Sequence, residues 1–556
     1  MKKHAPLRIV LALSIMIGSR ALPAYSAASE LASHGNQGDW PQWGGSPSRN
    51  NVSQAIGLPS HWDVGKTDRT TGRWIGASRE IRWVARLGSE CYTTPVVSGG
   101  RVFCATNNDG AHLARYPASV DLGVLLCFDR ADGRFLWQHS AEKLKTGKNV
   151  DWPKVGICAS PLVEDGRLWI VTNRGEVACL DTHGAAAGES KVIWVFDMVR
   201  ELGVVQRYMS NCSVTAAGDL LFVCTSNGRD VNDRLPAPQA PSFIALEKRS
   251  GKLVWADDSP GENILDGQWS SPAFAVLGGV PQAIFGGGDG WLYGFEAVAT
   301  SDGKPKRLWR FDCNPKPSVW EGGGSGDRDI IISTPVVYGG RVYVATGQDP
   351  ESGEGPGDLW CVDPTKRGDT SAELVVDRDG KPAPPRRRQA VDASAGEKVV
   401  PNPNSAAVWH YRGSGADGKK RAPGYHEGTA TGSGVNAEFQ GVFHRSLGSP
   451  TIKDDVLVIA DYAGLVHCLD ARTGLAHWTC DLQSAVWGSP LIADGKIYLG
   501  DQDGDVVVFA FGPKLKVLAK NNMANSVHST PVAAGGVLYI STATHLFALA
   551  AKPPAR

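Results

Sequence analysis

The chain is built from short apolar runs separated by turns, and toward its C-terminus this pattern repeats. Residues 449–469, 489–509 and 530–549 each begin with Ser-Pro or Thr-Pro, form one apolar strand, turn at Asp or Gly, and return as a second apolar strand. The anchoring prolines Pro450, Pro490 and Pro531 are 40 and 41 residues apart. A repeat of this length, made of short strands and tight turns, is typical of the blades of a β-propeller.

Two landmarks count the repeats. The first is a residue that anchors an inner strand: Pro95, Pro161, Val214 (in the degenerate copy 211–227), Pro272, Pro335, Pro450, Pro490 and Pro531. The second is a tryptophan in the last strand of each unit: Trp83, Trp137, Trp194, Trp255, Trp309, Trp409 and Trp478, with none in residues 515–520. We predict an all-β fold, an eight-bladed propeller of four-stranded antiparallel blades. Seven blades are the alternative, because the third unit is poorly formed.

The order of the landmarks predicts how the ring closes. Trp83 precedes the first anchoring proline, so the strand at residues 80–87 should complete the last blade and remove its exposed edge. The expected divisions are a signal peptide (1–28), a leading segment packing on the propeller (29–79), the propeller (80–550) and a tail (551–556). The Pro- and Arg-rich insertion 366–406 should be disordered-like and lie on the face opposite the long loops.

Charge and the N-terminus indicate location. Lys2, Lys3 and Arg8 precede an apolar stretch and small residues at 26–28, which is typical of an export signal; an uncleaved anchor is the alternative. The 57 basic and 57 acidic residues balance, so no overall field favours nucleic acid. We expect a periplasmic or secreted monomer without a transmembrane segment or a nucleic-acid partner.

The cysteines fall into two groups. Six recur at equivalent strand positions and should be small buried packing residues: Cys104, Cys127, Cys179, Cys224, Cys361 and Cys468. Cys91, Cys158 and Cys212 precede three consecutive inner strands, where a thiol cluster or a disulfide is an alternative to free thiols.

Residues 468–478 carry a family resemblance. The run Cys468-Leu-Asp470-Ala-Arg-Thr473-Gly474-Leu-Ala-His-Trp478 resembles the tryptophan-docking pattern of the PQQ-like (pyrroloquinoline quinone-like) β-propeller repeat family. Residues 39–53 are similar to the first segment of exported members. The resemblance spans residues 39–550 and implies the propeller fold.

Two branches of that family compete for the function. Quinoprotein dehydrogenases use PQQ and Ca²⁺ to oxidise alcohols or sugars, and the alcohol-oxidising members carry adjacent cysteines, a pair that this chain lacks. BamB-like members are non-enzymatic binding propellers and often lipoproteins, yet no cysteine lies within the first 90 residues here. The resemblance therefore leaves PQQ and Ca²⁺ open as cofactors.

A binding site is expected at the mouth of the channel, on the face that carries the long loops 108–123, 227–242, 347–358, 313–331 and 414–447. The residues three before each anchor should ring this mouth: Tyr92, Cys158, Asn211, Trp269, Ile332, Leu447, Trp487 and His528. From these and their neighbours, the predicted cofactor- or ligand-binding residues are Tyr92, Asn211, Trp269, His444, Arg445, Trp487 and His528. Such side chains could hold a flat polar ligand. The alternative is that the aromatic rings merely plug the channel.

Other motifs carry little chemistry. Residues 501–505 (DQDGD) resemble the start of a calcium loop, but the twelfth position is Gly512 rather than Glu, so we expect a hairpin turn and no metal. The glycines at 286–288 lie in a hairpin with no helix to bind a dinucleotide. No catalytic constellation stands out. The sequence favours a non-catalytic binding or scaffold protein; the alternative is a PQQ- and Ca²⁺-dependent alcohol or sugar dehydrogenase.

Overall fold

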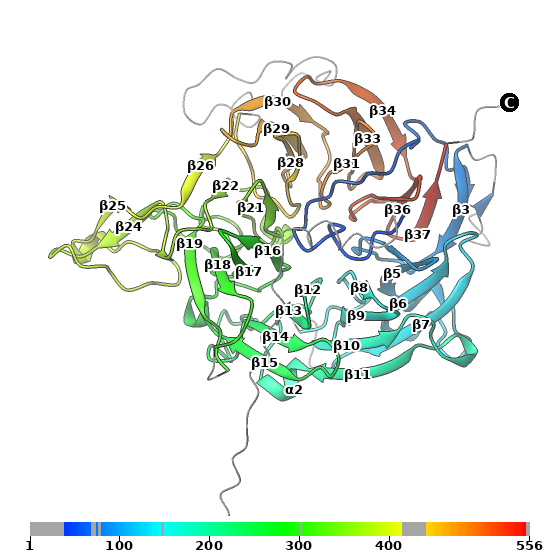
Figure 1. Cartoon of the computed structure of the whole chain (residues 1–556), viewed down its shortest axis with the longest axis horizontal. Coiled ribbons are helices and arrows are strands. Elements are labelled where there is room, and N and C mark those ends of the chain that lie inside the picture. The colour runs from blue at the N-terminus through cyan, green and yellow to red at the C-terminus, as the bar shows by residue number, and fades with distance from the viewer. Residues whose placement is uncertain are drawn as a thin grey trace, which may run out of the picture. The chain divides into compact units, whose positions relative to one another are not determined.

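The computed structural model describes residues 38–67, 74–75, 79–145, 150–300, 303–413 and 441–551. It confirms the predicted all-β propeller of eight four-stranded antiparallel blades (Figure 1). The proposed signal peptide, the loop residues 414–440 and most of the tail lie outside the described residues. Within the described part, no helix is both long enough and apolar enough to cross a membrane.

The blades follow one another in chain order. The first four are β4 (Val96–Ser98), β5 (Arg101–Asn107), β6 (Leu122–Asp129) and β7 (Phe135–Glu142); β8 (Leu162–Glu164), β9 (Arg167–Val171), β10 (Glu176–Asp181) and β11 (Lys191–Asp197); β12 (Thr215–Ala217), β13 (Leu220–Cys224), β14 (Phe243–Glu247) and β15 (Leu253–Asp257); and β16 (Ala273–Leu277), β17 (Val280–Gly286), β18 (Trp291–Glu296) and β19 (Arg307–Asp312). The next four are β20 (Val336–Tyr338), β21 (Arg341–Ala345), β22 (Leu359–Val362) and β26 (Ala407–Tyr411); β27 (Thr451–Lys453), β28 (Val456–Ala460), β29 (Leu465–Asp470) and β30 (Ala476–Asp481); β31 (Leu491–Ala493), β32 (Lys496–Gly500), β33 (Asp505–Ala510) and β34 (Val517–Asn522); and β35 (Val532–Ala534), β36 (Val537–Ser541), β37 (His545–Leu549) and β3 (Ile81–Arg86). A short helix, α2 (Met198–Leu202), and a two-stranded sheet of β1 (Lys66–Thr67) and β2 (Trp74–Ile75) lie outside the blades.

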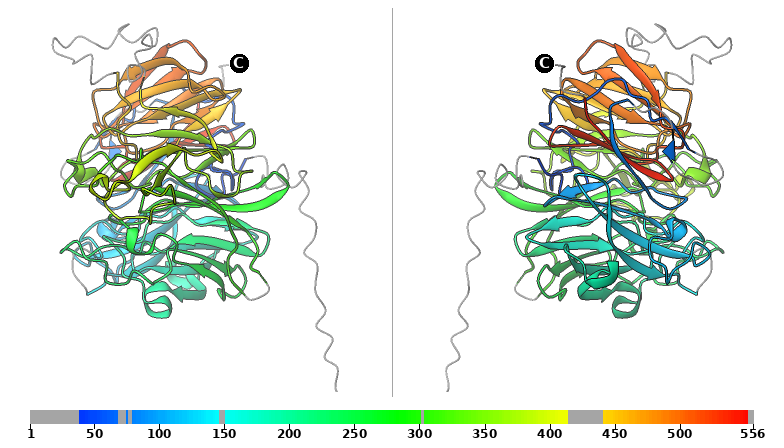
Figure 2. Two further views of the ribbon diagram at one scale, coloured as in Figure 1. Left: turned by 90° about the vertical axis from the view of Figure 1, so that its left-hand side faces the viewer. Right: turned by 90° about the vertical axis from the view of Figure 1, so that its right-hand side faces the viewer.

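The last blade joins the two ends of the described chain. β3 pairs antiparallel with β37, with Trp83 opposite Ala548 and Ala85 opposite Leu546. The blue β3 lies beside the red β37 in Figure 1 and in the right-hand view of Figure 2. The predicted closure is therefore confirmed, and it pairs an edge that β37 would otherwise expose.

Four blades are fastened to the next by a tryptophan that packs on a glycine. The indole N–H of Trp83 donates to the Arg130 carbonyl oxygen (3.0 Å), and its ring packs on Gly133 in the hairpin of the following blade. Trp409 repeats this arrangement with Ala471 (2.9 Å) and Gly474. A Cβ at either glycine would meet the indole at 2.6–2.8 Å, and both glycines have a φ of +72°. The docking pattern therefore needs glycine for its space as well as for its turn.

The leading segment crosses the inner strands of the whole ring. Its contacts are Trp40 with Val97 of blade 1, Pro41 with Val163 of blade 2, Gln42 with Thr215 of blade 3, Pro47 with Phe274 of blade 4, Ser48 with Val337 of blade 5, Asn50 with Ile452 of blade 6, Asn51 with Ile492 of blade 7 and Ser53 with Ala533 of blade 8. In seven blades the contacted residue is two positions after the anchoring proline. The segment is the dark-blue trace in the middle of the ring in Figure 1.

Arg49 holds this segment in place. Its guanidinium is fully buried and donates to the carbonyl oxygens of Pro272 (2.8 Å), Ser213 (2.6 Å) and Trp43 (2.9 Å). Burial lowers the pKa of Arg49 to about 9, which still leaves it charged at neutral pH. One side chain thus links the leading segment to blades 3 and 4.

The insertion 366–406 differs from the disordered-like segment that its composition suggested. Here β23 (Gly368–Asp369) pairs with β19 of blade 4, and β24 (Glu373–Val376) forms a hairpin with β25 (Lys398–Pro401), which projects from the ring in Figure 1. Its arginines explain the order, because Arg386 forms an ion pair with Glu397 and Arg387 forms one with Asp233. Since Asp233 belongs to a loop of the long-loop face, the expectation that the insertion stays on the opposite face is wrong.

The cysteines are all free in the structure, and every one except Cys158 is buried. The six expected to be packing residues, Cys104, Cys127, Cys179, Cys224, Cys361 and Cys468, are among the buried ones. Cys91, Cys158 and Cys212 do not contact one another through sulfur: they lie against Cys104 (3.7 Å), Met209 (3.6 Å) and the Cys224 backbone N–H (3.2 Å).

Candidate functional site

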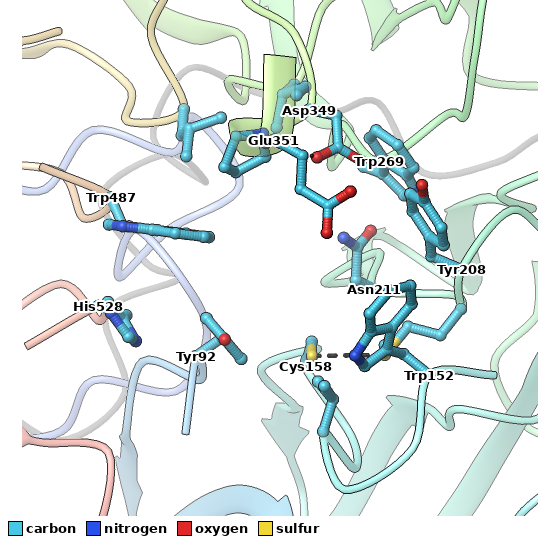
Figure 3. A pocket seen from close by; sticks show the side chains of 15 residues that line it. Tyr92, Trp152, Cys158, Tyr208, Asn211, Trp269, Asp349, Glu351, Trp487 and His528 are labelled. Atoms are coloured by element: carbon cyan, nitrogen blue, oxygen red, sulfur yellow. Dashed lines mark hydrogen bonds between the residues drawn. The ribbon is translucent and has the colours of Figure 1, made fainter. Parts of the chain in front are cut away.

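The mouth of the channel holds a cavity of about 370 Å³ (Figure 3). Eight of its lining residues occupy one equivalent position, three before the anchor of each blade: Tyr92, Cys158, Asn211, Trp269, Ile332, Leu447, Trp487 and His528. Propeller geometry explains this convergence, because equivalent positions of the inner strands face a common axis. The ring of residues expected from the sequence does come together around one cavity, whose volume lies in the range of small-molecule sites.

Seven further lining residues come from loops, and sequence reasoning missed them. They are Trp152, Val155, Tyr208, Met209, Asp349, Pro350 and Glu351. The first four belong to the connections that lead into blades 2 and 3, and the last three to the loop between β21 and β22. The only signal in the sequence was the length of the loop 347–358 on this face, since loop side chains follow no repeat register.

Aromatic rings form two opposing groups in the cavity. Tyr92 stacks on His528 (ring centroids 5.0 Å apart, planes 10° apart), and Trp487 packs against both at 5.5 Å and 4.9 Å. Across the cavity, Tyr208 and Trp269 are stacked with their planes 11° apart (Figure 3). Flat ring faces thus border the cavity from two sides, which suits a flat guest.

Trp152 extends the second group. Its ring meets Tyr208 edge-on, with centroids 5.3 Å apart. Behind that group, Arg207 lies 3.8 Å from the Tyr208 ring, and its Nε donates to Asp266 at 2.9 Å. Arg207 shares the buried Asp266 carboxylate with Arg229, and it is not among the residues that line the cavity.

Two carboxylates give the cavity its polarity. Asp349 and Glu351 flank Pro350 in a short 3₁₀ turn, where an Asp349 carboxylate oxygen accepts the Glu351 backbone N–H (2.9 Å). Figure 3 shows the Glu351 carboxylate directed into the cavity. Burial raises the pKa of Asp349 to about 6, and neighbouring Asp266 and Glu351 add to the rise while Arg207 opposes it. With a pKa of about 6, the Asp349 carboxyl is mostly ionised at pH 7.

Polar atoms without partners also lie at the lining. Asn211 Oδ1 and His528 Nδ1 are buried and have no hydrogen-bond partner among the described residues. Burial lowers the pKa of His528 to about 4, so its imidazole is neutral at pH 7. A buried acceptor without a hydrogen bond destabilises the fold, so these two atoms are suited to hydrogen-bond a polar ligand.

His444 and Arg445 are placed elsewhere. His444 is buried, and its Nδ1 lies 3.0 Å from Asp461, which also contacts His467. Arg445 is 1% exposed, and its Nε donates to Asp329 at 3.0 Å. Both side chains pair with buried carboxylates inside the protein, so the structure does not bring them to the cavity lining with the other five predicted binding residues.

The cavity does not suit PQQ with its calcium ion. The quinone carries carboxylate groups, and the lining presents two carboxylates with no Lys or Arg among its fifteen described residues. In the described part of the chain, no group of three or more His, Cys, Asp or Glu side chains is placed to hold a metal ion. Residues 501–505 connect β32 and β33, with Asp505 N–H donating to Asp501.

The leading segment covers one end of the channel, so the cavity is open at the other end only. In seven blades the contact with the segment lies five positions after the cavity residue, a span of about 16 Å, and in blade 3 it lies four positions after it. The segment therefore lies at the far end of the channel. A ligand would enter the cavity from the long-loop face.

The fold and its axial cavity define a PQQ-like propeller, and comparison with known proteins gives the family. A family model described as outer membrane protein assembly factor BamB matches residues 121–349 and 429–552, which is more than half of the chain. The chain belongs to this PQQ-like propeller family.

Individual relatives are distant. A polyvinylalcohol dehydrogenase from a Pseudomonas species is 29% identical over 221 residues, which is 37% of this chain and 31% of that protein. The chain thus matches about a third of the length of that relative. A quinohemoprotein alcohol dehydrogenase from Pseudomonas putida has the same fold (TM-score 0.55, 12% identity, 96% of this chain and 84% of that one). BamB from Moraxella catarrhalis gives a TM-score of 0.47 at 15% identity over 85% and 98% of the chains.

Proposed function

We propose that this protein is a non-catalytic binding propeller that receives a ligand, or a side chain of a partner, in its channel-mouth cavity. The observation that carries this proposal is the convergence of eight equivalent positions on one cavity with two groups of flat rings and two carboxylates. The N-terminal export pattern supports a periplasmic or secreted location, where such a ligand would be met.

A quinoprotein dehydrogenase is the second candidate, and the match to a polyvinylalcohol dehydrogenase favours it. If PQQ bound, it would supply the oxidising chemistry. The lining offers this candidate less support, because no Lys or Arg among its described residues could pair with the carboxylate groups of the quinone. We therefore prefer binding without turnover.

The test separates binding, catalysis and plugging. Purified protein is mixed with PQQ and Ca²⁺ and assayed for dye reduction with alcohols and sugars, and small cationic, neutral and anionic aromatic probes are titrated by calorimetry. We expect no turnover and saturable binding of at least one probe. Trp487→Ala should abolish that binding, while Trp291→Ala, a half-buried tryptophan outside the cavity, should not.

Two results would contradict the proposal. Turnover with PQQ would establish the dehydrogenase reading. Loss of stability in Trp487→Ala, with no probe bound by the wild-type protein, would show that the rings only plug the channel.

A further inference from the structure

The charged residues that line the cavity are all acidic. Among its fifteen described lining residues, Asp349 and Glu351 are acidic and none is Lys or Arg. The lining histidine, His528, is neutral at pH 7 because burial lowers its pKa. A guest with a positive charge would be attracted, whereas an anionic guest would be repelled.

Nearby cations do not neutralise these carboxylates. Arg207 is committed to Asp266 at 2.9 Å, and Lys143 to Asp151 at 2.6 Å. Within the described part of the chain, neither Asp349 nor Glu351 has an ion-pair partner. Asp349 is half-buried beside the rings, and leaving its carboxylate there without a cation costs stability. Such a cost is typical of a group kept for binding rather than for folding.

The rings favour a cation as well. Aromatic faces attract cations, most strongly when the pair is desolvated, and planar guanidinium groups also stack on them. The two ring groups present Trp487 and Tyr92 on one side and Trp269 and Tyr208 on the other (Figure 3). The carboxylates lie between these groups, so one planar cation could contact a ring face and an acid together.

Hydrogen bonding narrows the class further. Asn211 Oδ1 is a buried acceptor without a partner among the described residues, and the carboxylates accept hydrogen bonds too. A quaternary ammonium has no N–H to offer them, whereas a guanidinium or an amidinium has several. The acceptor atoms of the cavity would therefore be satisfied best by a ligand whose hydrogen-bond donors carry a positive charge.

Building on the proposed binding function, we propose that the cavity recognises a planar cation with N–H donors, of the guanidinium or amidinium class. The cation would contact the ring faces and donate to Glu351, Asp349 and Asn211. A free small molecule and an arginine side chain of a partner protein offer this same chemistry.

Three probes of the same shape and different charge test whether the cavity prefers a cation. Benzamidine, benzamide and benzoate are flat, similar in size, and cationic, neutral and anionic at pH 7.5. Titration by calorimetry should show benzamidine binding about tenfold or more tighter than benzamide, with no binding of benzoate. A higher salt concentration should lower the affinity for benzamidine and leave the affinity for benzamide unchanged.

Matched variants locate the contact. Glu351→Gln should lower the affinity for benzamidine about five- to twentyfold and leave the affinity for benzamide unchanged. Glu354→Gln is the control, because Glu354 lies in the same loop and is exposed like Glu351, but does not line the cavity. Agmatine and a blocked Gly-Arg-Gly peptide then distinguish the free cation from a protein side chain: tighter binding of the peptide indicates a protein partner.

The outcomes separate this inference from the proposed function. Equal or tighter binding of benzamide or benzoate would overturn the cation assignment while leaving a binding cavity. Equal effects of Glu351→Gln and Glu354→Gln would also overturn it. Absence of binding by all three probes would overturn the binding function as well.

Discussion

Two carboxylates carry the argument at the scale of single residues. Asp349 and Glu351 sit in a cavity of rings without a neutralising cation among the described residues, and the pKa of Asp349 is raised by burial to about 6. By contrast, most buried carboxylates of this chain have partners, such as Asp312 with Arg328 and Lys316. Asp289 and Asp501, which lie outside the cavity, are likewise buried without an ion-pair partner among the described residues, and burial raises the pKa of each to about 6. Asp349 differs from them in that it lines the cavity.

The raised pKa predicts that Asp349→Asn stabilises the protein. In an unfolded chain Asp titrates near pH 4, so the cost of ionising Asp349 in the fold is absent below about pH 4 and complete above about pH 6. Asparagine removes this cost and keeps an oxygen for the Glu351 N–H. Urea unfolding should show a gain of about 1–2 kcal/mol at pH 8 and none near pH 4.

The control for this prediction is Glu354→Gln, which should change stability at neither pH. A loss of stability in Asp349→Asn at pH 8 would mean that the carboxylate is satisfied in the fold.

The sequence predicted the repeat positions of the site but not its loop residues. Tyr92, Trp269 and Trp487 follow from the blade register, because a repeat fixes which positions face the axis. Glu351 obeys no register, and its place depends on how one loop folds over the mouth. His444 and Arg445 were predicted at the mouth, but buried Asp461 and Asp329 attract them, and such pairing is invisible in the sequence.

At the scale of elements, the docking of tryptophan on glycine holds neighbouring blades together. Trp409 in β26 of blade 5 packs on Gly474 in the hairpin between β29 and β30 of blade 6. The spacing of Gly and Trp in the sequence indicated the turn. It did not indicate that each glycine receives the tryptophan of the preceding blade, because that contact joins residues far apart in the chain.

Gly474→Ala should therefore destabilise the protein strongly. The new Cβ would lie 2.8 Å from the Trp409 ring, at a φ of +72°. We expect a loss of about 2–4 kcal/mol in the free energy of unfolding. Gly495→Ala is the matched control, since its φ is +66° and nothing lies within 4 Å of its Cβ, and it should cost about 1 kcal/mol.

Similar losses for the two variants in denaturant unfolding would show that backbone strain alone matters. The tryptophan contact would then contribute nothing to the register between blades.

At the scale of the whole molecule, the chain closes its ring twice. β3 pairs with β37 at the outer edge of blade 8, and the leading segment contacts the inner strands of all eight blades. The alternation of apolar runs predicted the first closure. The leading segment was expected to pack on the propeller, but its course across all eight blades was not predicted, because residues 38–53 are irregular and have no periodicity of their own.

Arg49→Met tests the inner closure. The substitution leaves the carbonyl oxygens of Pro272, Ser213 and Trp43 without their donor in a buried place. We expect a loss of about 3 kcal/mol or more in the free energy of unfolding, whereas the exposed Arg472→Met should change little. Benzamidine affinity of the folded protein should stay unchanged, because Arg49 does not line the cavity. Equal stability of the two variants would contradict this role.

A crystal soaked in benzamidine tests most directly whether the cavity binds a cation. We predict density for the probe between the Trp487 and Trp269 sides, with its amidinium within hydrogen-bonding distance of Glu351. Well-ordered crystals in which the cavity stays free of the probe, or the probe binds only elsewhere, would contradict it.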